Sequence, residues 1–320
     1  MSGPVDPVDP DAADVIARWP NEALGSSIPW FQDQFRSKGI EIDGGSALSR
    51  ALCRLSRLKH LLDTGEADHF NTIEAAVESF AEGDGADFLS KTLHRGHLAG
   101  LALDHERWRH LVCGNPIPTV AAPSSRERNL TWESVLACAM ATFCKDVHFA
   151  EPDVVGEFQG REFGIAAKVA YSDKKLWRNV RKGANQADGL SDAAVILVNV
   201  VNLLPLADVF RTTLTLPTAS KVRDFVVAWA DRWCSQPEAL SAASEWKETA
   251  KNPIGVAFFM PFVVESEKQP LSCYYVNMPV VWREEASPDF EFAREFLHAC
   301  NSVLGFQASG ESSVVTEQPT

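Results

Sequence analysis

The spacing of apolar residues changes at residues 114–128, a stretch rich in proline, serine and glycine. Before it, apolar residues recur at helical spacing, as in ALSRALCRLSRLKHLLDTG, where leucines follow one another every three or four residues. After it, short apolar runs alternate with helical segments, a pattern typical of a sheet covered by helices on both faces. The sequence therefore predicts a helical N-terminal domain at residues 13–113, a linker at 114–128 and an α/β domain at 129–306.

Within the predicted α/β domain the elements can be placed by periodicity and by turn residues. We expect a helix at 129–145, strands near 150–158 and 163–171, a helix at 173–188 and a strand at 193–201. A helix around 220–233, strands at 255–265 and 273–282 and a last helix at 287–303 complete it. Residues 1–12, in which prolines alternate with aspartates, and the polar tail 307–320 are predicted to be disordered.

Composition limits the function classes. No apolar run approaches the roughly 20 residues of a membrane helix, and the N-terminus does not resemble a signal peptide, so we expect a soluble, cytoplasmic protein without membrane contact. The seven cysteines form no CxxC pair, which argues against a disulfide framework or a cysteine zinc site. A net charge of −13 opposes a generally basic surface, although a local basic face could still bind phosphate.

Three side chains are candidates for chemistry. Asp153 follows Pro152 where the first strand of the pair begins, and Lys168 lies in the second strand on a face of very small residues, which leaves room for a ligand. Glu133 falls at the edge of the apolar face of the 129–145 helix. The alternatives are an edge-strand lysine that prevents aggregation and an ordinary first-turn glutamate stabilised by the helix dipole.

The 173–188 helix has a basic face. Its apolar residues lie opposite a stripe of cations with Gln186 on the same side, and one-sided basicity in an acidic chain favours a phosphate partner over a merely solvated surface. The stripe consists of Lys174, Lys175, Arg178, Arg181 and Lys182.

Together, the helix with Glu133, the Pro152–Asp153 dipeptide, the hairpin, the GIAAKV strand and the helix with Gln186 resemble the PD-(D/E)XK nuclease superfamily. The resemblance covers residues 126–202, about a quarter of the chain. It implies a restriction-endonuclease-like mixed sheet flanked by helices and a Mg²⁺- or Mn²⁺-dependent DNA endonuclease. By this resemblance, Asp153 and Glu133 would hold the metal, and Lys168 and Gln186 would complete the catalytic set.

The sequence departs from that family at Ala166, which stands two residues before Lys168, where a second metal-binding acid is expected. Three explanations are open: a natural inactive relative, an acid that has moved to Glu157 or Glu162, or a substitution introduced to remove activity. The resemblance accordingly predicts a nucleic-acid-acting protein, of a kind often found in restriction or phage defence. The alternatives are a catalytically inactive binding or scaffolding subunit and a module that binds only protein.

Further partners and sites can be stated as expectations. DNA is the expected ligand, with a protein partner on the N-terminal helical domain and a homodimer as possible assemblies.

The histidines His94, His97, His105 and His110 lack the spacing of a zinc motif. The tryptophans Trp229, Trp233 and Trp246 are predicted to pack in the core rather than stack on bases. No GxGxxG, Walker lysine or GxSxG motif occurs.

Overall fold

The computed structural model describes residues 24–64, 73–123, 125–188, 192–204, 228, 231–239, 241, 253–266, 269–281 and 288–304. The predictions of disorder at both ends, most of the predicted 220–233 helix, and the predictions for Trp229 and Trp246 lie outside the described residues. In the part of the chain that is described, no helix is long and apolar enough to cross a membrane.

The described elements alternate as the sequence predicts after residue 126. Helices come first: α1 (Ile28–Ser37), α2 (Ala47–Thr64), α3 (Ile73–Leu98), α4 (His105–Val112) and α5 (Arg126–Met140). Strands β1 (Lys145–His148), β2 (Val154–Phe158) and β3 (Arg161–Val169) follow, then α6 (Asp173–Ala187) and β4 (Ala193–Asn199). The last described elements are β5 (Pro253–Ser266), β6 (Gln269–Val281) and α10 (Pro288–Leu304).

The strands form one mixed sheet in the order β1-β2-β3-β4-β5-β6. Strand β2 pairs antiparallel with both β1 and β3, strands β3, β4 and β5 run parallel, and β6 returns antiparallel to β5. A parallel pair needs a crossover connection, and α6 supplies the one between β3 and β4. The chain is therefore an α/β protein with a mixed sheet.

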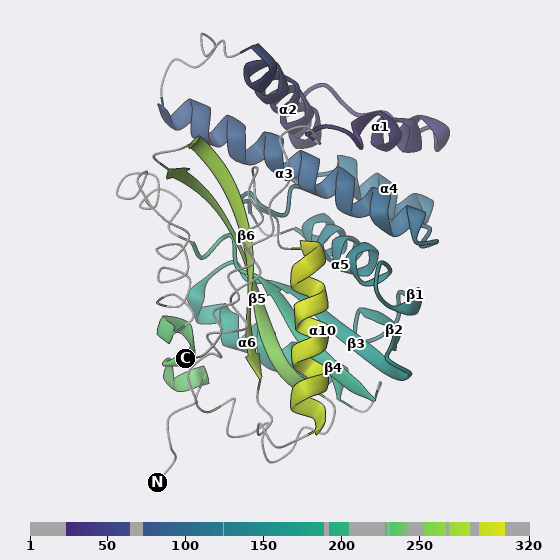
Figure 1. Ribbon diagram of the computed structural model, residues 1–320, viewed down its shortest axis with the longest axis vertical. Coiled ribbons are helices and arrows are strands. Elements are labelled where there is room, and N and C mark those ends of the chain that lie inside the picture. The colour runs from purple at the N-terminus through teal and green to yellow at the C-terminus, as the bar shows by residue number, and fades with distance from the viewer. Residues whose placement is uncertain are drawn as a thin grey trace, which may run out of the picture.

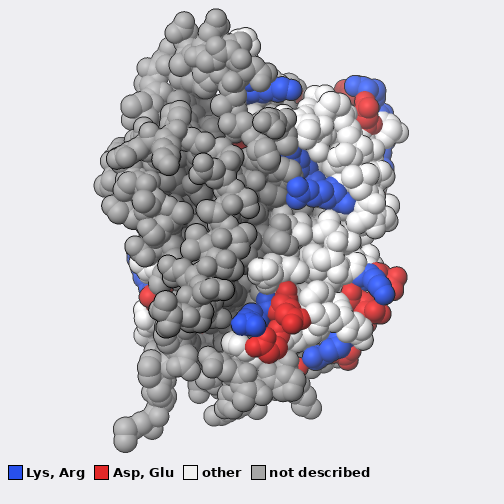
Figure 2. Space-filling model, in the orientation of Figure 1, with Lys and Arg blue, Asp and Glu red and all other residues white. Residues whose placement is uncertain are grey.

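Helices cover both faces of this sheet. Figure 1 shows α10 in front of the strands and α6 behind them, with α3 and α4 above α5. The faces follow strand alternation: in β4, Val195 and Leu197 join the core beneath α5 and α10, while Ile196 lies against α6 at Gly183. On the face drawn in Figure 2, the basic and acidic side chains of the described residues stand in small groups among uncharged ones.

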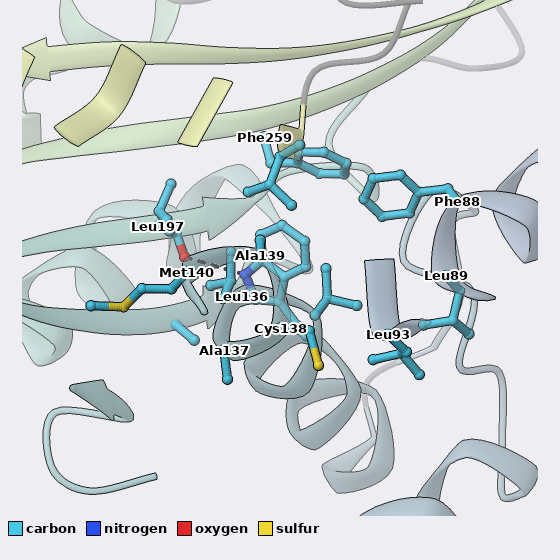
Figure 3. Packing of buried hydrophobic residues seen from close by; sticks show 14 of the residues in the cluster. Phe88, Leu89, Leu93, Leu136, Ala137, Cys138, Ala139, Met140, Leu197 and Phe259 are labelled. Atoms are coloured by element: carbon cyan, nitrogen blue, oxygen red, sulfur yellow. Dashed lines mark hydrogen bonds between the residues drawn. The ribbon is translucent and has the colours of Figure 1, made fainter. Parts of the chain in front are cut away.

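Helix α5 is buried on nearly all sides because it lies between α3 and the sheet. Figure 3 shows Phe88, Leu89 and Leu93 of α3 approaching it from one side and Leu197 and Phe259 from the sheet. The ring of Trp132 on α5 lies 4.9 Å from that of Phe259, and its indole Nε1 donates to the Leu197 carbonyl at 3.4 Å.

The predicted helix at 129–145 is misplaced at both ends. The side chain of Ser125 accepts a hydrogen bond from the Arg128 amide, so this N-cap starts the helix at Arg126. The helix ends at Met140, and after a turn the chain forms β1, a strand that was not predicted. Strand β1 is short and mostly exposed, so its sequence lacks an apolar alternation.

The segment predicted to be a linker, residues 114–128, is packed against the protein. Ile117 and Thr119 in it are buried, and its last residues belong to α5. The buried Arg128 guanidinium donates to the carbonyl oxygens of Asn115 and Val120, and burial lowers the pKa of Arg128 to about 10. One apolar cluster includes residues of α1–α4 and of the sheet, so the N-terminal helices and the sheet share a core.

We predict that substituting Gly96 will loosen the contact between α3 and α5. A Cβ atom at Gly96 would lie 2.5 Å from Cβ and 2.6 Å from Cα of Cys138, so the two helices would have to separate. Gly96→Ala should lower the free energy of unfolding by about 1–3 kcal/mol in urea titration, despite the higher helix propensity of alanine. At Gly44 nothing lies within 4 Å of the added Cβ, so Gly44→Ala is the control and should be nearly neutral; an equal loss in both variants would contradict the prediction.

Candidate active site

The candidate site lies at the open end of the β2–β3 hairpin. The hairpin turns at Gln159 and Gly160, which both have positive φ angles, as a two-residue turn of type I′ requires. The register from Phe158↔Arg161 to Val154↔Ile165 then places Asp153, one residue before β2, near the end of β3 that carries Lys168. The turn therefore fixes which residues meet, although it lies at the far end of the hairpin.

Asp153 and Lys168 form an ion pair. The Lys168 Nζ atom lies 2.6 Å from Oδ2 of Asp153, and the same oxygen accepts a hydrogen bond from the Ala167 amide at 2.8 Å. Nζ also donates to the Ala167 carbonyl at 3.0 Å. Their side chains are only 16% and 13% exposed, so both charges are held in a largely desolvated setting.

Glu133 reaches the same region from α5. It is the one residue between 131 and 140 that is not fully buried, so the helix presents a carboxylate at its single opening in this stretch. Arg107 of α4 holds it, with Nη1 3.4 Å from Glu133 Oε2 and 3.3 Å from Ser134 Oγ. The Arg107 guanidinium also lies 3.3 Å from the centroid of the Phe149 ring.

The electrostatics of the site link Glu133 to Asp153 and to Lys168. Burial raises the pKa of Glu133, and the negative charge of Asp153 raises it further, while Arg107 and Lys168 partly offset both effects. Burial likewise raises the pKa of Asp153, against the lowering effect of Lys168 and the Ala167 amide, and the charge of Glu151 adds to the rise. Two desolvated acids and two cations thus share one site, an arrangement common in catalytic centres.

Gln186 lies next to this group without touching Asp153. Its Nε2 atom donates to Oε2 of Glu151 at 3.4 Å, and its Oε1 atom is buried without a hydrogen-bond partner among the described residues. Gln186 therefore contacts the segment that leads into Asp153.

Ala166 is fully buried and packs against α6. A Cβ atom built on Gly183 of that helix would lie 3.3 Å from the Ala166 Cβ and 2.9 Å from Cγ2 of Ile196. The proposed replacement acids lie elsewhere: Glu157 and Glu162 pair with each other near the turn of the hairpin. Glu157 lies four positions along the strand from Asp153, which corresponds to roughly 13 Å between their Cα atoms. Because Glu162 pairs with Glu157, neither acid lies at the site.

The basic stripe of α6 is present as predicted. Leu176, Trp177, Val180, Ala184 and Ala187 are buried, as expected from their spacing. The cations at 174, 175, 178 and 182 are exposed, whereas Arg181 is half-buried and donates from Nη2 to Ser241 Oγ at 3.1 Å.

The side chains that could hold a divalent ion are Glu133 and Asp153. No three His, Cys, Asp or Glu side chains of the described residues are gathered closely enough to bind a metal by themselves. Two carboxylates nevertheless fit Mg²⁺ when substrate phosphate supplies further oxygens. A cation would also offset the negative charge of Asp153, which adds to the effect of burial in raising the pKa of Glu133.

The other sequence-based candidates do not join this site. His94 accepts or donates a hydrogen bond with Ser27 Oγ at 3.1 Å and stacks on Trp30, whose ring also lies 5.4 Å from that of His97. Trp233 is buried and packs on Phe258, which confirms its predicted role in the core.

Two residues of the site were missed in the sequence. Arg107 lies in the helical region, and nothing in its neighbourhood of the chain indicates that it will reach Glu133. Glu151, two residues before Asp153, could have been noted as an additional acid.

Comparison of the chain with protein-family models, with curated proteins and with solved structures gives no match.

We predict that neutralising the site carboxylates will stabilise the protein. Because their pKa values are raised in the folded state, stability falls as the pH rises from the ordinary carboxyl range through the raised pKa. Asp153→Asn and Glu133→Gln should therefore raise the melting temperature at pH 8 but not at pH 3, by a few degrees if about 1 kcal/mol is gained.

Thermal unfolding at the two pH values tests this prediction. Glu162→Gln, at an exposed carboxylate on the same hairpin, is the control and should change little. Lower melting temperatures for both site variants at pH 8 would show that their ion pairs outweigh the cost of burying the charges.

Proposed function

We propose that the protein binds DNA along α6 and the open end of the β2–β3 hairpin and cleaves phosphodiester bonds there in a metal-dependent reaction. The observation that carries the proposal is the convergence of Glu133 from α5, Asp153 from the residue before β2 and Lys168 from β3, beside a basic helix. The order of these elements is also the one that the PD-(D/E)XK resemblance implies. A role in restriction or phage defence would follow from that resemblance.

Each group of the site has a role suited to this chemistry. Asp153 and Glu133 would hold Mg²⁺ or Mn²⁺, which supplies charge stabilisation and a bound water of lowered pKa. Lys168 provides a positive charge beside the reacting phosphate, and Arg107 orients the Glu133 carboxylate through its hydrogen bond. The exposed cations of α6 bind backbone phosphates, which would make binding sensitive to salt.

A second candidate, a binding subunit without catalysis, is favoured by Ala166. Its side chain is enclosed against α6, so the site has one carboxylate fewer than the resemblance implies. The Lys168 ammonium, moreover, already occupies one oxygen of Asp153. In this alternative the same surface binds nucleic acid, and the ion pair has no catalytic role.

Cleavage of circular and linear DNA in Mg²⁺ and in Mn²⁺ separates the two candidates. We predict that Asp153→Asn and Lys168→Ala each reduce cleavage by about 100-fold or more, since each removes a group that stabilises the transition state. Lys145→Ala, which removes an exposed cation from β1, is the control and should cut normally. DNA retarded on a gel but left uncut in either metal would favour the binding subunit, and neither cutting nor retardation would contradict both.

The contribution of the basic stripe can be measured without catalysis. Lys175→Ala and Lys182→Ala should each weaken DNA binding in EDTA and reduce the slope of log K against log salt by about 1. We also propose that the protein forms a homodimer and binds a protein partner on helices α1–α4, and sedimentation of the full chain with and without DNA tests the homodimer. Unchanged salt slopes in both variants would exclude α6 as the phosphate-binding surface.

A further inference from the structure

A pocket of about 350 Å³ lies beside the first half of α6, between this helix and residues 231–239. Its volume falls in the range of small-molecule sites. Lys174, Trp177, Arg178 and Arg181 line it from α6 together with Asp173, and Gln236 and Glu238 line it from the other segment. The Trp177 indole Nε1 donates to the Trp233 carbonyl at 3.1 Å, which holds the two walls together.

The pocket and the candidate active site lie on opposite flanks of α6. With about 100° per residue, Trp177 is half a turn of the helix away from Gln186, the residue that contacts Glu151. Arg181 is directed the same way as Trp177, as its hydrogen bond to Ser241 shows. The basic stripe is therefore divided, with Lys174, Arg178 and Arg181 beside the pocket.

The lining combines two kinds of chemistry. Three cations in one pocket favour a phosphate or another compact anion, and arginine suits phosphate particularly well because its donors match the phosphate oxygens. Asp173 and Glu238, in contrast, would oppose a bare anion, but they can accept hydrogen bonds from amino groups. Oδ1 of Asp173 is buried and has no hydrogen-bond partner among the described residues, so an acceptor is available there.

The remaining wall is aromatic and amide. Trp177 is only 5% exposed, so a small part of its ring reaches the pocket, and Gln236 carries both a donor and an acceptor for a polar ligand. A ligand that joins a phosphate to amino or ring N–H donors and carbonyl acceptors suits these groups, and a nucleotide has this composition.

We propose that this pocket binds a single phosphorylated nucleoside. Its phosphate lies among Lys174, Arg178 and Arg181, and its base forms hydrogen bonds with Gln236 and Asp173. The nucleoside is either a free nucleotide or the 5′-phosphorylated end of a strand, which present the same chemistry. The proposal does not depend on DNA cleavage, because binding is measured in EDTA.

Calorimetric titration of the full-length protein tests this proposal with four kinds of probe. These are the four 5′-mononucleotides, titrated one at a time, inorganic phosphate, a 5′-phosphorylated trinucleotide and the same trinucleotide without phosphate. We expect at least one mononucleotide or the phosphorylated trinucleotide to bind with a Kd below about 1 mM. Saturation by a mononucleotide identifies a free nucleotide as the ligand, whereas saturation by the phosphorylated trinucleotide alone identifies a strand end.

Two variants assign the binding to the pocket. Arg178→Ala removes an exposed cation of the lining and should weaken binding at least tenfold, whereas Lys145→Ala, the matched loss of a cation on β1, should not change it. Asp173→Asn should reduce the preference for nucleotide over inorganic phosphate. The proposal is overturned if none of the phosphorylated probes binds, if both cation variants weaken binding equally, or if inorganic phosphate binds as tightly as every nucleotide probe.

Discussion

The burial of α5 between α3 and the sheet is the constraint on which the rest of the structure depends. Ten of its fifteen residues are buried, and the α3 contact is close enough that Gly96 lies directly on Cys138. A helix enclosed on two sides in this way fixes the distance between the N-terminal helices and the strands. It also brings Arg107 of α4 within reach of Glu133, because α4 lies against α5 on the side where the helix is open.

The candidate site follows from this arrangement and from the hairpin. Helix α5 fixes one carboxylate, and the β2–β3 register fixes the other together with Lys168. Both acids are held in a desolvated setting that raises their pKa values, so the fold accepts a cost in stability where these charges converge. Structural ion pairs are usually exposed and weak, and this partly buried group of four charges differs from them.

The sequence predicted most of the α/β region because local signals there agree with the tertiary structure. Strands β2, β3, β4, β5 and β6 and helices α6 and α10 all fall where apolar runs and helical spacing indicate them. The sequence-based prediction failed where the local pattern of residues does not reflect the tertiary contacts. Strand β1 lacks alternation because it is exposed, and residues 114–128 look like a linker although Arg128 secures them from α5. The motif singled out Asp153, Lys168 and Glu133. The contact of Arg107 with Glu133 joins residues that are 26 positions apart, and no sequence pattern near either residue indicates it.

Ala166 is best understood through the packing of α6. In the hairpin it continues the β2–β3 register opposite Asp153, and its side chain points at Gly183, so two of the smallest residues meet where the helix crosses the strand. A carboxylate at 166 would be directed at the backbone of α6 and could be accommodated only if the helix moved outward. That movement would separate Gln186 from Glu151 and Trp177 from Trp233, since both contacts come from the same rigid helix. Close packing of α6 and a second acid on β3 therefore exclude each other in this arrangement, and any further oxygen ligand at the site must come from the nucleic acid, from water or from the segment that precedes Asp153.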